Sequence, residues 1–265
     1  MKIGIIGIGV VGSAIKYGIE MLGHDVAVHD KKLDTSIENV LNTEVCFLCV
    51  PTPSSQNGKC DTSIVESIVD DLNALGYTGV VAIKSTVEPG TTEKLQGKHP
   101  GLTLCFVPEF LRERCAISDF VENHDVCVIG TDSEVVFSKI KKCHGKYPKE
   151  FVKVSVTEAE FCKYFINTYN ATIITFANSF YEVCKNAGVD YSKVKNAMVL
   201  KGHINDSYLE CNENFRGFGG VCLPKDIKAL NFLAKKLKTD VGFFGFVKSE
   251  NDKYEVTVIP GMRKQ

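Results

Sequence analysis

The first twelve residues carry the feature that most restricts the fold. A short β-branched run, residues 2–6, leads directly into Gly7, Gly9 and Gly12, and a helical pattern follows. In this G-x-G-x-x-G arrangement, the amide groups of residues such as Val10 and Val11 and the positive end of the helix can hold a pyrophosphate. The sequence therefore predicts a dinucleotide-binding βαβ unit, although such glycines also serve tight turns and close packing without a ligand.

An acidic residue stands where this fingerprint needs one. Asp30 closes the second predicted strand, where a carboxylate can accept hydrogen bonds from the adenosine ribose hydroxyls and repel a 2′-phosphate. This residue favours NAD over NADP. Lys31 and Lys32 lie beside Asp30 and could weaken the exclusion of NADP, but a solvated lysine pair is the simpler interpretation.

The first half of the chain alternates strand-like and helix-like patterns. Strand-like runs such as EVCFLCV, VVAIKS, TLCFV and DVCVIG are separated by amphipathic segments. This alternation is typical of βαβ units with a parallel sheet. We therefore predict an α/β class with an NAD-binding Rossmann domain over residues 1–153.

The hydrophobic period changes after this domain. From Thr157 to near Gly188, about thirty residues run without proline or internal glycine and with apolar residues at helical spacing. Shorter helical patterns follow at 192–198 and 225–237. The sequence predicts a smaller all-helical domain over 154–240, built on one long helix, and a tail at 241–265 that is either a frayed helix or a small hairpin.

Composition excludes several classes of partner. The 31 basic and 32 acidic side chains nearly cancel without a block of like charge, so we expect neither nucleic acid nor an anionic membrane as a partner. The glycine-interrupted start predicts neither a signal peptide nor a membrane span. Eleven cysteines without a secretory signal indicate reduced thiols in the cytoplasm. A small-molecule partner is expected.

One cysteine lies in a setting that suits a nucleophile. Cys222 follows a flexible GFGG loop and precedes a predicted helix, whose first amides and Lys225 can favour a thiolate. Asp226 lies four residues later on the same helix face, where it could move a proton or merely cap the helix. A buried, inert cysteine is the alternative for Cys222.

The long helix carries a second polar pair. Lys163 and Asn167 are four residues apart and therefore share a face, where an ammonium and a carboxamide could stabilise an oxyanion. Solvated surface residues are the alternative. Metal ligands are not expected: Cys46 and Cys49 form a C-x-x-C inside a strand-like run, and the six histidines are isolated.

Five segments in order resemble the UDP-glucose and GDP-mannose dehydrogenase family. They are VPTP at 50–53, KSTVEPGTT at 84–92, PEFLRE at 108–113, EAEFCKYFINT at 158–168 and GFGGVCLPKD at 217–226. The resemblance extends to about Leu237. It implies oxidation of a nucleotide sugar at the C6 alcohol to a carboxylate in two NAD-dependent steps, through a thioester on Cys222.

The resemblance also assigns roles to individual residues. It makes Lys163, Asn167 and Asp226 catalytic, gives Glu109 the activation of water for thioester hydrolysis, and gives Thr86 the placing of a water beside the nicotinamide. It implies that Thr52 and Glu113 lie at the cofactor, with Glu113 also near the sugar. The alternatives are ordinary turn hydroxyls for Thr52 and Thr86, and a solvent-exposed ion pair with Arg112 or Arg114 for Glu113. The residues implied to contact the substrate further include Phe110, Leu111, Phe218, Gly219 and Lys225. A homodimer through the long helix is also implied.

The sequence departs from the family pattern in three places. Family members continue into a further UDP-binding domain that is missing from this sequence, Arg114 replaces a common glycine, and the HINDSYLE segment lacks a common arginine. The favoured activity is oxidation of UDP-glucose to UDP-glucuronate. The alternatives are a short β-hydroxyacid-type dehydrogenase, which would need no thiolate, and a catalytically idle NAD-binding remnant.

Overall fold

The computed structural model describes residues 1–55 and 57–257, and these form two compact units. Unit 1 contains residues 1–55 and 60–163, whereas unit 2 contains residues 57–59 and 164–257. The division falls inside the long helix α6 (Val156–Asn186), so the first turns of α6 belong to unit 1. Each unit has hydrophobic clusters of its own.

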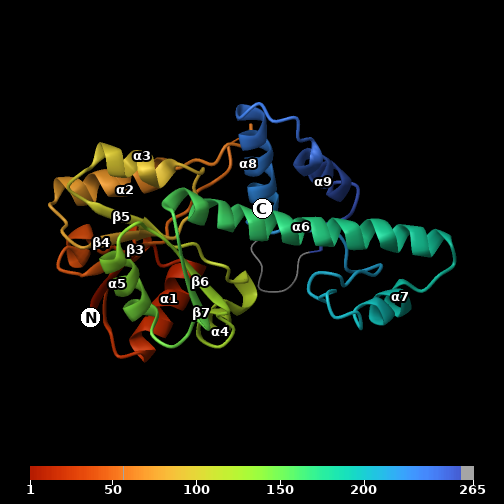
Figure 1. Ribbon diagram of the computed structural model, residues 1–265, viewed down its shortest axis with the longest axis horizontal. Coiled ribbons are helices and arrows are strands. Elements are labelled where there is room, and N and C mark those ends of the chain that lie inside the picture. The colour runs from red at the N-terminus through yellow and green to blue at the C-terminus, as the bar shows by residue number, and fades with distance from the viewer. Residues whose placement is uncertain (56, 258–265) are drawn as a thin grey trace. The chain divides into compact units, whose positions relative to one another are not determined.

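Among the described residues, unit 1 is built on a seven-stranded sheet with the order β2-β1-β3-β4-β5-β6-β7 (Figure 1). The strands are β1 (Lys2–Ile6), β2 (Asp25–His29), β3 (Val45–Leu48), β4 (Val80–Ile83), β5 (Thr103–Phe106), β6 (Val126–Gly130) and β7 (Glu150–Val154). Pairing is parallel from β2 to β5 and again between β6 and β7. The predicted Rossmann class is confirmed.

Helices cover both faces of this sheet. α1 (Val10–Met21), α4 (Ala116–Val121) and α5 (Glu134–His144) pack on the face that carries Phe47 and Ala82. α2 (Ser63–Ala74) and α3 (Thr91–Lys98) pack on the face that carries Leu48 and Ile83. Because neighbouring strand residues point to opposite faces, β3 and β4 are apolar at every position, as expected for central parallel strands. Short 3-10 turns lie at Lys31–Leu33, Ile37–Val40 and Glu113–Cys115.

Some elements of unit 1 were not predicted from the sequence. β7 has mostly exposed or half-buried residues because it lies at the edge of the sheet, so it lacks a continuous apolar run. α3 and α4 span only two turns or so, too short for a clear helical period. β5 and β6 pair antiparallel through Phe106 and Gly130, an exception to the parallel sheet that the alternation predicted.

The carboxylate of Glu160 fastens the first turns of α6 to the rest of unit 1. Glu160 is fully buried, and its Oε1 accepts from the backbone N of Thr92 at 2.9 Å and from Thr92 Oγ1 at 2.6 Å. Its Oε2 accepts from the backbone N of Gly90 at 2.5 Å. Burial raises the pKa of Glu160. The backbone amides at the start of α3 have no acceptor within the helix, and they donate to the Glu160 carboxyl instead.

Replacing Glu160 by alanine should lower the free energy of unfolding by about 3 kcal/mol, because buried donors lose their acceptor and a cavity remains. Chemical denaturation would measure this change. Glu158→Ala is the matched control on the same helical turn; its exposed carboxylate bonds the backbone of Ser155, and a much smaller loss is expected. Equal losses for the two variants would contradict the anchoring role of Glu160.

Helices dominate unit 2. After α6 come α7 (Tyr191–Met198), α8 (Leu223–Lys236) and α9 (Phe243–Asn251), so the long helix and the two shorter helices predicted from the sequence are confirmed. α9 falls within the predicted tail at 241–265, of which residues 258–265 lie outside the described residues. One cluster joins α6 to α7, and another joins α6, α8 and α9 around Phe218. Within the described ranges, no helix has the length and hydropathy of a membrane span.

Candidate active site

The three glycines of the first loop form a tight turn between β1 and α1. Gly7 has a φ of +92°, and a Cβ atom there would lie 2.7 Å from the backbone oxygen of Cys49. A Cβ atom on Gly12 would lie 2.0 Å from the oxygen of Gly7. A Cβ atom on Gly9 would meet nothing within 4 Å. Gly7 and Gly12 thus serve the turn and its packing, while the open surface at Gly9 fits the close approach of a pyrophosphate.

The start of α1 provides the charge that this ligand needs. α1 begins at Val10, and its N-cap residue is Gly9, which has no side chain to accept from the amides of the first turn. The first turn also lacks acidic residues. The amides of Val10 and Val11 and the positive end of the helix are therefore suited to an anion.

Asp30 is held beside the glycine loop by backbone amides. Its Oδ2 accepts from the backbone N of Ile8 at 2.6 Å, and its Oδ1 accepts from the backbone N of Lys32 at 2.8 Å. These bonds, led by that of Lys32, lower the pKa of Asp30. Each carboxylate oxygen keeps a second lone pair, so the ionised group can still accept from ribose hydroxyls. Lys31 and Lys32 are exposed.

Two further predicted cofactor residues, Thr52 and Thr86, follow the carboxyl ends of β3 and β4. Thr52 is buried, and Thr86 is half-buried with its carbonyl accepting from the Sγ of Cys60 at 3.3 Å. Between these loops, the hydroxyl of Ser85 donates to the carbonyl of Val50 at 2.7 Å. The loops after two adjacent strands are thus tied together at the edge where dinucleotides bind in such sheets.

Lys84 is a polar residue of this edge that the sequence analysis missed. It comes directly after β4, is only 4% exposed, and its Nζ lies 5.5 Å from the centroid of the Phe47 ring. A buried cation needs compensation, and the face of an aromatic ring supplies part of it. The signal in the sequence was a lysine immediately after a fully apolar strand.

Glu109 and Lys163 form a direct pair in unit 1. Lys163 Nζ donates to Glu109 Oε1 at 3.0 Å and to the backbone oxygen of Glu109 at 2.7 Å. Their side chains are 12% and 4% exposed, respectively. Glu109 Oε2 also accepts from the backbone N of Leu111 at 2.8 Å. The sequence analysis predicted Glu109 and Lys163 as site residues independently, and the structure shows that they are bonded to each other.

The rest of the PEFLRE segment follows Glu109 in the chain. Phe110 and Leu111 are half-buried, as is Glu113 at the start of a 3-10 turn. Arg112 forms a bidentate ion pair with Asp119, with Nη2 to Oδ1 at 2.6 Å and Nε to Oδ2 at 3.0 Å. The guanidinium of Arg112 is therefore engaged by Asp119.

A second polar cluster lies in unit 2 around Asp226. This carboxylate is fully buried; its Oδ2 accepts from Asn167 Nδ2 at 2.5 Å, and its Oδ1 accepts from Lys225 Nζ at 2.6 Å. Asn167 itself is 8% exposed. Side chains of α6 and α8 thus bond both oxygens of this carboxylate, which lies in the first turn of α8.

Cys222 is exposed, whereas the other ten cysteines are buried or half-buried. It is the N-cap residue of α8, and its backbone oxygen accepts from the backbone N of Asp226 at 2.9 Å. In the preceding loop, Phe218 is buried, and a Cβ atom on Gly219 would meet the side chain of Val256. Cys222 is therefore an accessible thiol at a helix N-terminus, the setting in which a thiolate is favoured.

The remaining cysteines have the character of core residues. Burial raises the pKa of the Cys49 thiol to about 12 and that of the Cys46 thiol still further. Both belong to the apolar surroundings of β3. Among residues 1–55 and 57–257, no group of three or more histidine, cysteine or acidic side chains could hold a metal ion.

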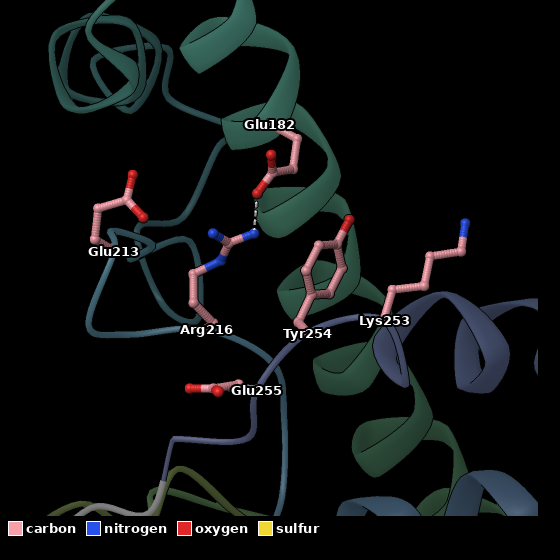
Figure 2. Close-up of a pocket in the computed structure, with 6 residues that line it drawn as sticks. All are labelled: Glu182, Glu213, Arg216, Lys253, Tyr254 and Glu255. Carbon is pink, nitrogen blue, oxygen red and sulfur yellow. Dashed lines mark hydrogen bonds and ion pairs between the residues drawn. The ribbon is translucent and has the colours of Figure 1, made fainter.

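A hollow of about 420 Å³ lies beside the loop that leads to Cys222 in unit 2 (Figure 2). It is lined by Glu182, Glu213, Arg216, Lys253, Tyr254 and Glu255. Much of this lining is paired within the protein, since Arg216 binds Glu182 and Glu213 binds Lys185. The residues that line the hollow do not include the predicted catalytic residues, and the ion pair with Glu182 holds Arg216 in its wall.

Two sequence models of one family match the chain. The UDP-glucose/GDP-mannose dehydrogenase family, NAD binding domain, matches residues 27–147. The central domain of the same family matches residues 157–253. These ranges correspond to the α/β part and the helical part described above.

Similar proteins of known name agree with these matches. UDP-glucose 6-dehydrogenase AglM of Haloferax volcanii is 30% identical over 87% of this chain and 64% of its own length. GDP-mannose 6-dehydrogenase of Pseudomonas aeruginosa is 30% identical over 80% of this chain and 51% of its own length. The solved structure of a UDP-glucose dehydrogenase from Pyrobaculum islandicum has a TM-score of 0.86 at 27% identity, covering 95% of this chain and 68% of that one.

The chain thus spans between about half and two thirds of the length of these relatives. Its α/β part carries the glycine loop, the start of α1 and Asp30, and Asp30 lies within the residues that match the NAD-binding domain of that family. The chain belongs to the UDP-glucose/GDP-mannose dehydrogenase family and contains its NAD-binding and central domains.

Proposed function

We propose that this protein is an NAD-dependent nucleotide-sugar 6-dehydrogenase that oxidises UDP-glucose to UDP-glucuronate through a thioester on Cys222. The observation that carries the proposal is the exposed thiol of Cys222 at the start of α8, one helical turn before a buried carboxylate, Asp226, that is bonded to Asn167. Alcohol oxidation alone needs no nucleophile. A thiol in this position is explained by a second oxidation at the aldehyde level.

The proposed reaction forms and breaks one covalent bond to the protein. When held by the glycine loop and Asp30, NAD would supply the hydride acceptor for two oxidation steps, one at the alcohol and one at the thiohemiacetal. The Cys222 thiolate attacks the aldehyde carbon and forms a C–S bond, and oxidation of this thiohemiacetal gives a thioester. Water then breaks the C–S bond, releases the carboxylate and restores the thiolate. The balance is one alcohol, one water and two NAD+ to one carboxylate, two NADH and three protons.

The polar side chains divide the remaining tasks. We assign stabilisation of the alkoxide and of the thiohemiacetal oxyanion to Lys163 and Asn167, because an ammonium and a carboxamide can both donate to a developing negative charge. Glu109 takes the proton of the attacking water, and Asp226 moves a proton or holds that water. The bond from Lys163 to Glu109 keeps the carboxylate oriented before water is activated.

Further residues are assigned to binding. The cofactor would be contacted by Thr52, Thr86 and Glu113. Thr86 would also hold a water beside the nicotinamide. The proposed substrate contacts are Phe110, Leu111, Phe218, Gly219 and Lys225. UDP-glucose is preferred here over other nucleotide sugars because its dehydrogenases are among the relatives of this chain, although GDP-mannose enzymes are among them too.

A stoichiometric assay tests the proposal. The protein is incubated with NAD and a panel of UDP- and GDP-sugars, and NADH and carboxylate are both quantified. Two NADH per carboxylate on UDP-glucose is the expected result. One NADH with a carbonyl product would instead indicate a β-hydroxyacid-type dehydrogenase, and NAD binding without turnover would indicate an idle NAD-binding remnant.

The surface of α6 supports a homodimer as the working assembly. Exposed apolar side chains recur along this helix at intervals of three, four and seven residues, which places them on one side. They are Phe161, Phe165, Tyr169, Phe176, Phe180 and Val183, between 41% and 72% exposed. An apolar stripe without charges can pair with its own copy about a two-fold axis. We therefore propose a dimer through α6.

The double variant Phe165→Glu/Phe176→Glu should be monomeric, because carboxylates would be buried against each other across the two-fold axis. Sedimentation velocity over a range of concentrations measures the mass, with a dimer expected for the wild type. Lys193→Glu, an exposed change on α7, is the control and should leave the dimer intact. A dimeric double variant would contradict this interface.

A further inference from the structure

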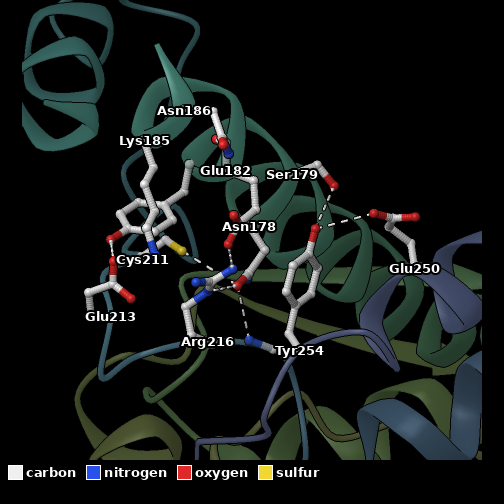
Figure 3. Close-up of polar contacts among 12 residues, drawn as sticks. Asn178, Ser179, Glu182, Lys185, Asn186, Cys211, Glu213, Arg216, Glu250 and Tyr254 are labelled. Atoms are coloured by element: carbon white, nitrogen blue, oxygen red, sulfur yellow. Dashed lines mark hydrogen bonds and ion pairs between the residues drawn. The ribbon is translucent and has the colours of Figure 1, made fainter. Parts of the chain in front are cut away.

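The loop that carries Cys222 is bound by two buried side chains from distant parts of the sequence. Asn251, the last residue of α9, accepts from the backbone N of Phe218 at 2.7 Å through Oδ1 and donates to the backbone oxygen of Phe218 at 3.0 Å through Nδ2. Asn178 on α6 accepts from the backbone N of Gly217 at 3.2 Å (Figure 3). Asn251 is 2% exposed and Asn178 is 1% exposed.

Buried amides of this kind are costly unless every bond is made. The ring of Phe218 packs with Ala171, Ile227 and Val247, so apolar side chains would suit this region better on hydrophobic grounds. Asn251 instead satisfies both backbone groups of one residue, and Asn178 donates to Ile174 while it accepts from the loop. Buried polar groups that bond the backbone on both the donor and the acceptor side favour one backbone arrangement.

Arg216 adds a third fixed point at the start of the loop. Its Nε donates to Asn178 Oδ1 at 2.8 Å (Figure 3). Its guanidinium lies 4.9 Å from the ring centroid of Tyr254 (Figure 2) and 4.8 Å from that of Tyr181. The backbone N of Arg216 donates to Thr257 Oγ1 at 2.7 Å. Residues 216, 217 and 218 are therefore all held, in part by residues that follow α9.

We propose that Asn178 and Asn251 are positioning residues that hold the loop at 216–220 so that the thiol of Cys222 stays at the N-terminus of α8. The proposal rests on the function assigned to Cys222 above. Phe218 lies only four residues before Cys222, so holding its backbone restricts the path of the chain that leads to the thiol. A displacement of about 1 Å at a reacting group can cost about a hundredfold in rate.

Three variants and a control test this role in the 265-residue chain. Asn251→Leu and Asn178→Leu keep similar volume and lose the bonds to the loop. Asn251→Asp keeps an oxygen that accepts from the backbone N of Phe218 and loses the NH2 group that donates to its backbone oxygen. This variant replaces Asn251→Leu as the test if the leucine variant does not fold. Asn186→Leu is the matched control, since Asn186 is exposed on α6 and its Nδ2 donates to the backbone oxygen of Glu182 in the same helix.

Two of the measurements need no turnover. Hydrogen exchange at the amides of Gly217 and Phe218 should accelerate about tenfold in the leucine variants, the loss of roughly one hydrogen bond. Alkylation of Cys222 by iodoacetamide at pH 7, followed by peptide mass spectrometry, should slow about threefold, because the helix N-terminus no longer favours the thiolate. If the wild type turns over no nucleotide sugar, the proposed function fails while these two measurements still decide the positioning role.

Kinetics separate positioning from a general loss of structure. In the leucine variants, kcat should fall about a hundredfold while the Kd for NAD stays within about twofold, and Asn251→Asp should lie between the wild type and Asn251→Leu. Asn186→Leu should match the wild type in every measurement. Unchanged exchange and alkylation in both leucine variants would overturn the proposal, as would an equal loss of NAD affinity and kcat.

Discussion

Replacing Cys222 by serine is expected to reduce carboxylate formation from the nucleotide sugar by at least about a thousandfold. A serine hydroxyl is far less ionised than a thiol at neutral pH and is a poor nucleophile without an activating base. The exposed position of Cys222 means that the exchange of sulfur for oxygen leaves the core intact. The variant should therefore fold, bind NAD with unchanged affinity and fail after the first oxidation. Product analysis by mass spectrometry and NADH absorbance measures both steps.

The matched control for this variant is Cys184→Ser, which changes a buried thiol of the cluster between α6 and α7. It should lose some thermal stability and retain turnover below its unfolding temperature, because Cys184 has no part in the proposed chemistry. Trapping with semicarbazide should reveal aldehyde in the Cys222→Ser reaction and none in the control. Carboxylate yield from Cys222→Ser within tenfold of the wild type would rule out the thioester.

Much of the architecture followed from hydrophobic patterning. Central strands such as β3 and β4 are buried on both faces, so their apolar runs were continuous and easily recognised. α6 was equally clear, because an uninterrupted helical period continues for some thirty residues. Fully apolar strands and long periodic helices are the elements in which local sequence and tertiary burial give the same answer.

The elements that escaped prediction depend on tertiary context. β7 lies at the edge of the sheet and pairs with β6 while exposing Glu150 and Lys153, so its sequence resembles a loop. The antiparallel contact between Phe106 and Gly130 depends on the path of the chain between β5 and β6. A Cβ atom at Gly130 would lie 2.6 Å from that of Ala159, so the glycine there allows α6 to approach.

The candidate site shows the same division. Motif positions identified Glu109, Lys163, Asn167 and Asp226, but no spacing in the sequence relates Lys163 to Glu109 or Asn167 to Asp226 as bonded partners. These pairs are separated by 54 and 59 residues, respectively. Asn251 lay outside the recognised motifs, because a polar residue at the end of a short helix has no period or spacing that would mark its partner. Such long-range bonds are determined by the folded backbone.

Gly9→Ala is expected to weaken NAD binding strongly without lowering the stability of the fold. A methyl group at Gly9 meets no protein atom within 4 Å, so the variant should fold as stably as the wild type. The same methyl group would project into the space that the pyrophosphate needs at the start of α1. We expect the Kd for NAD to rise about a hundredfold, which corresponds to about 2.7 kcal/mol. Isothermal titration calorimetry and thermal unfolding measure the two quantities on one preparation.

Two further alanine substitutions make this comparison decisive. Gly97→Ala on α3 also introduces a methyl group into open space, so it should leave NAD affinity unchanged and stabilise the helix slightly. Gly12→Ala would force its methyl group to within 2.0 Å of the oxygen of Gly7, so it should lose both stability and NAD binding. Gly97→Ala should therefore bind NAD much more tightly than Gly9→Ala. Of the three variants, only Gly12→Ala should unfold at a lower temperature than the wild type. If Gly9→Ala bound NAD as tightly as Gly97→Ala does, the pyrophosphate would have to lie elsewhere, because no tightly bound phosphate at this helix terminus could tolerate a methyl group between it and the backbone amides.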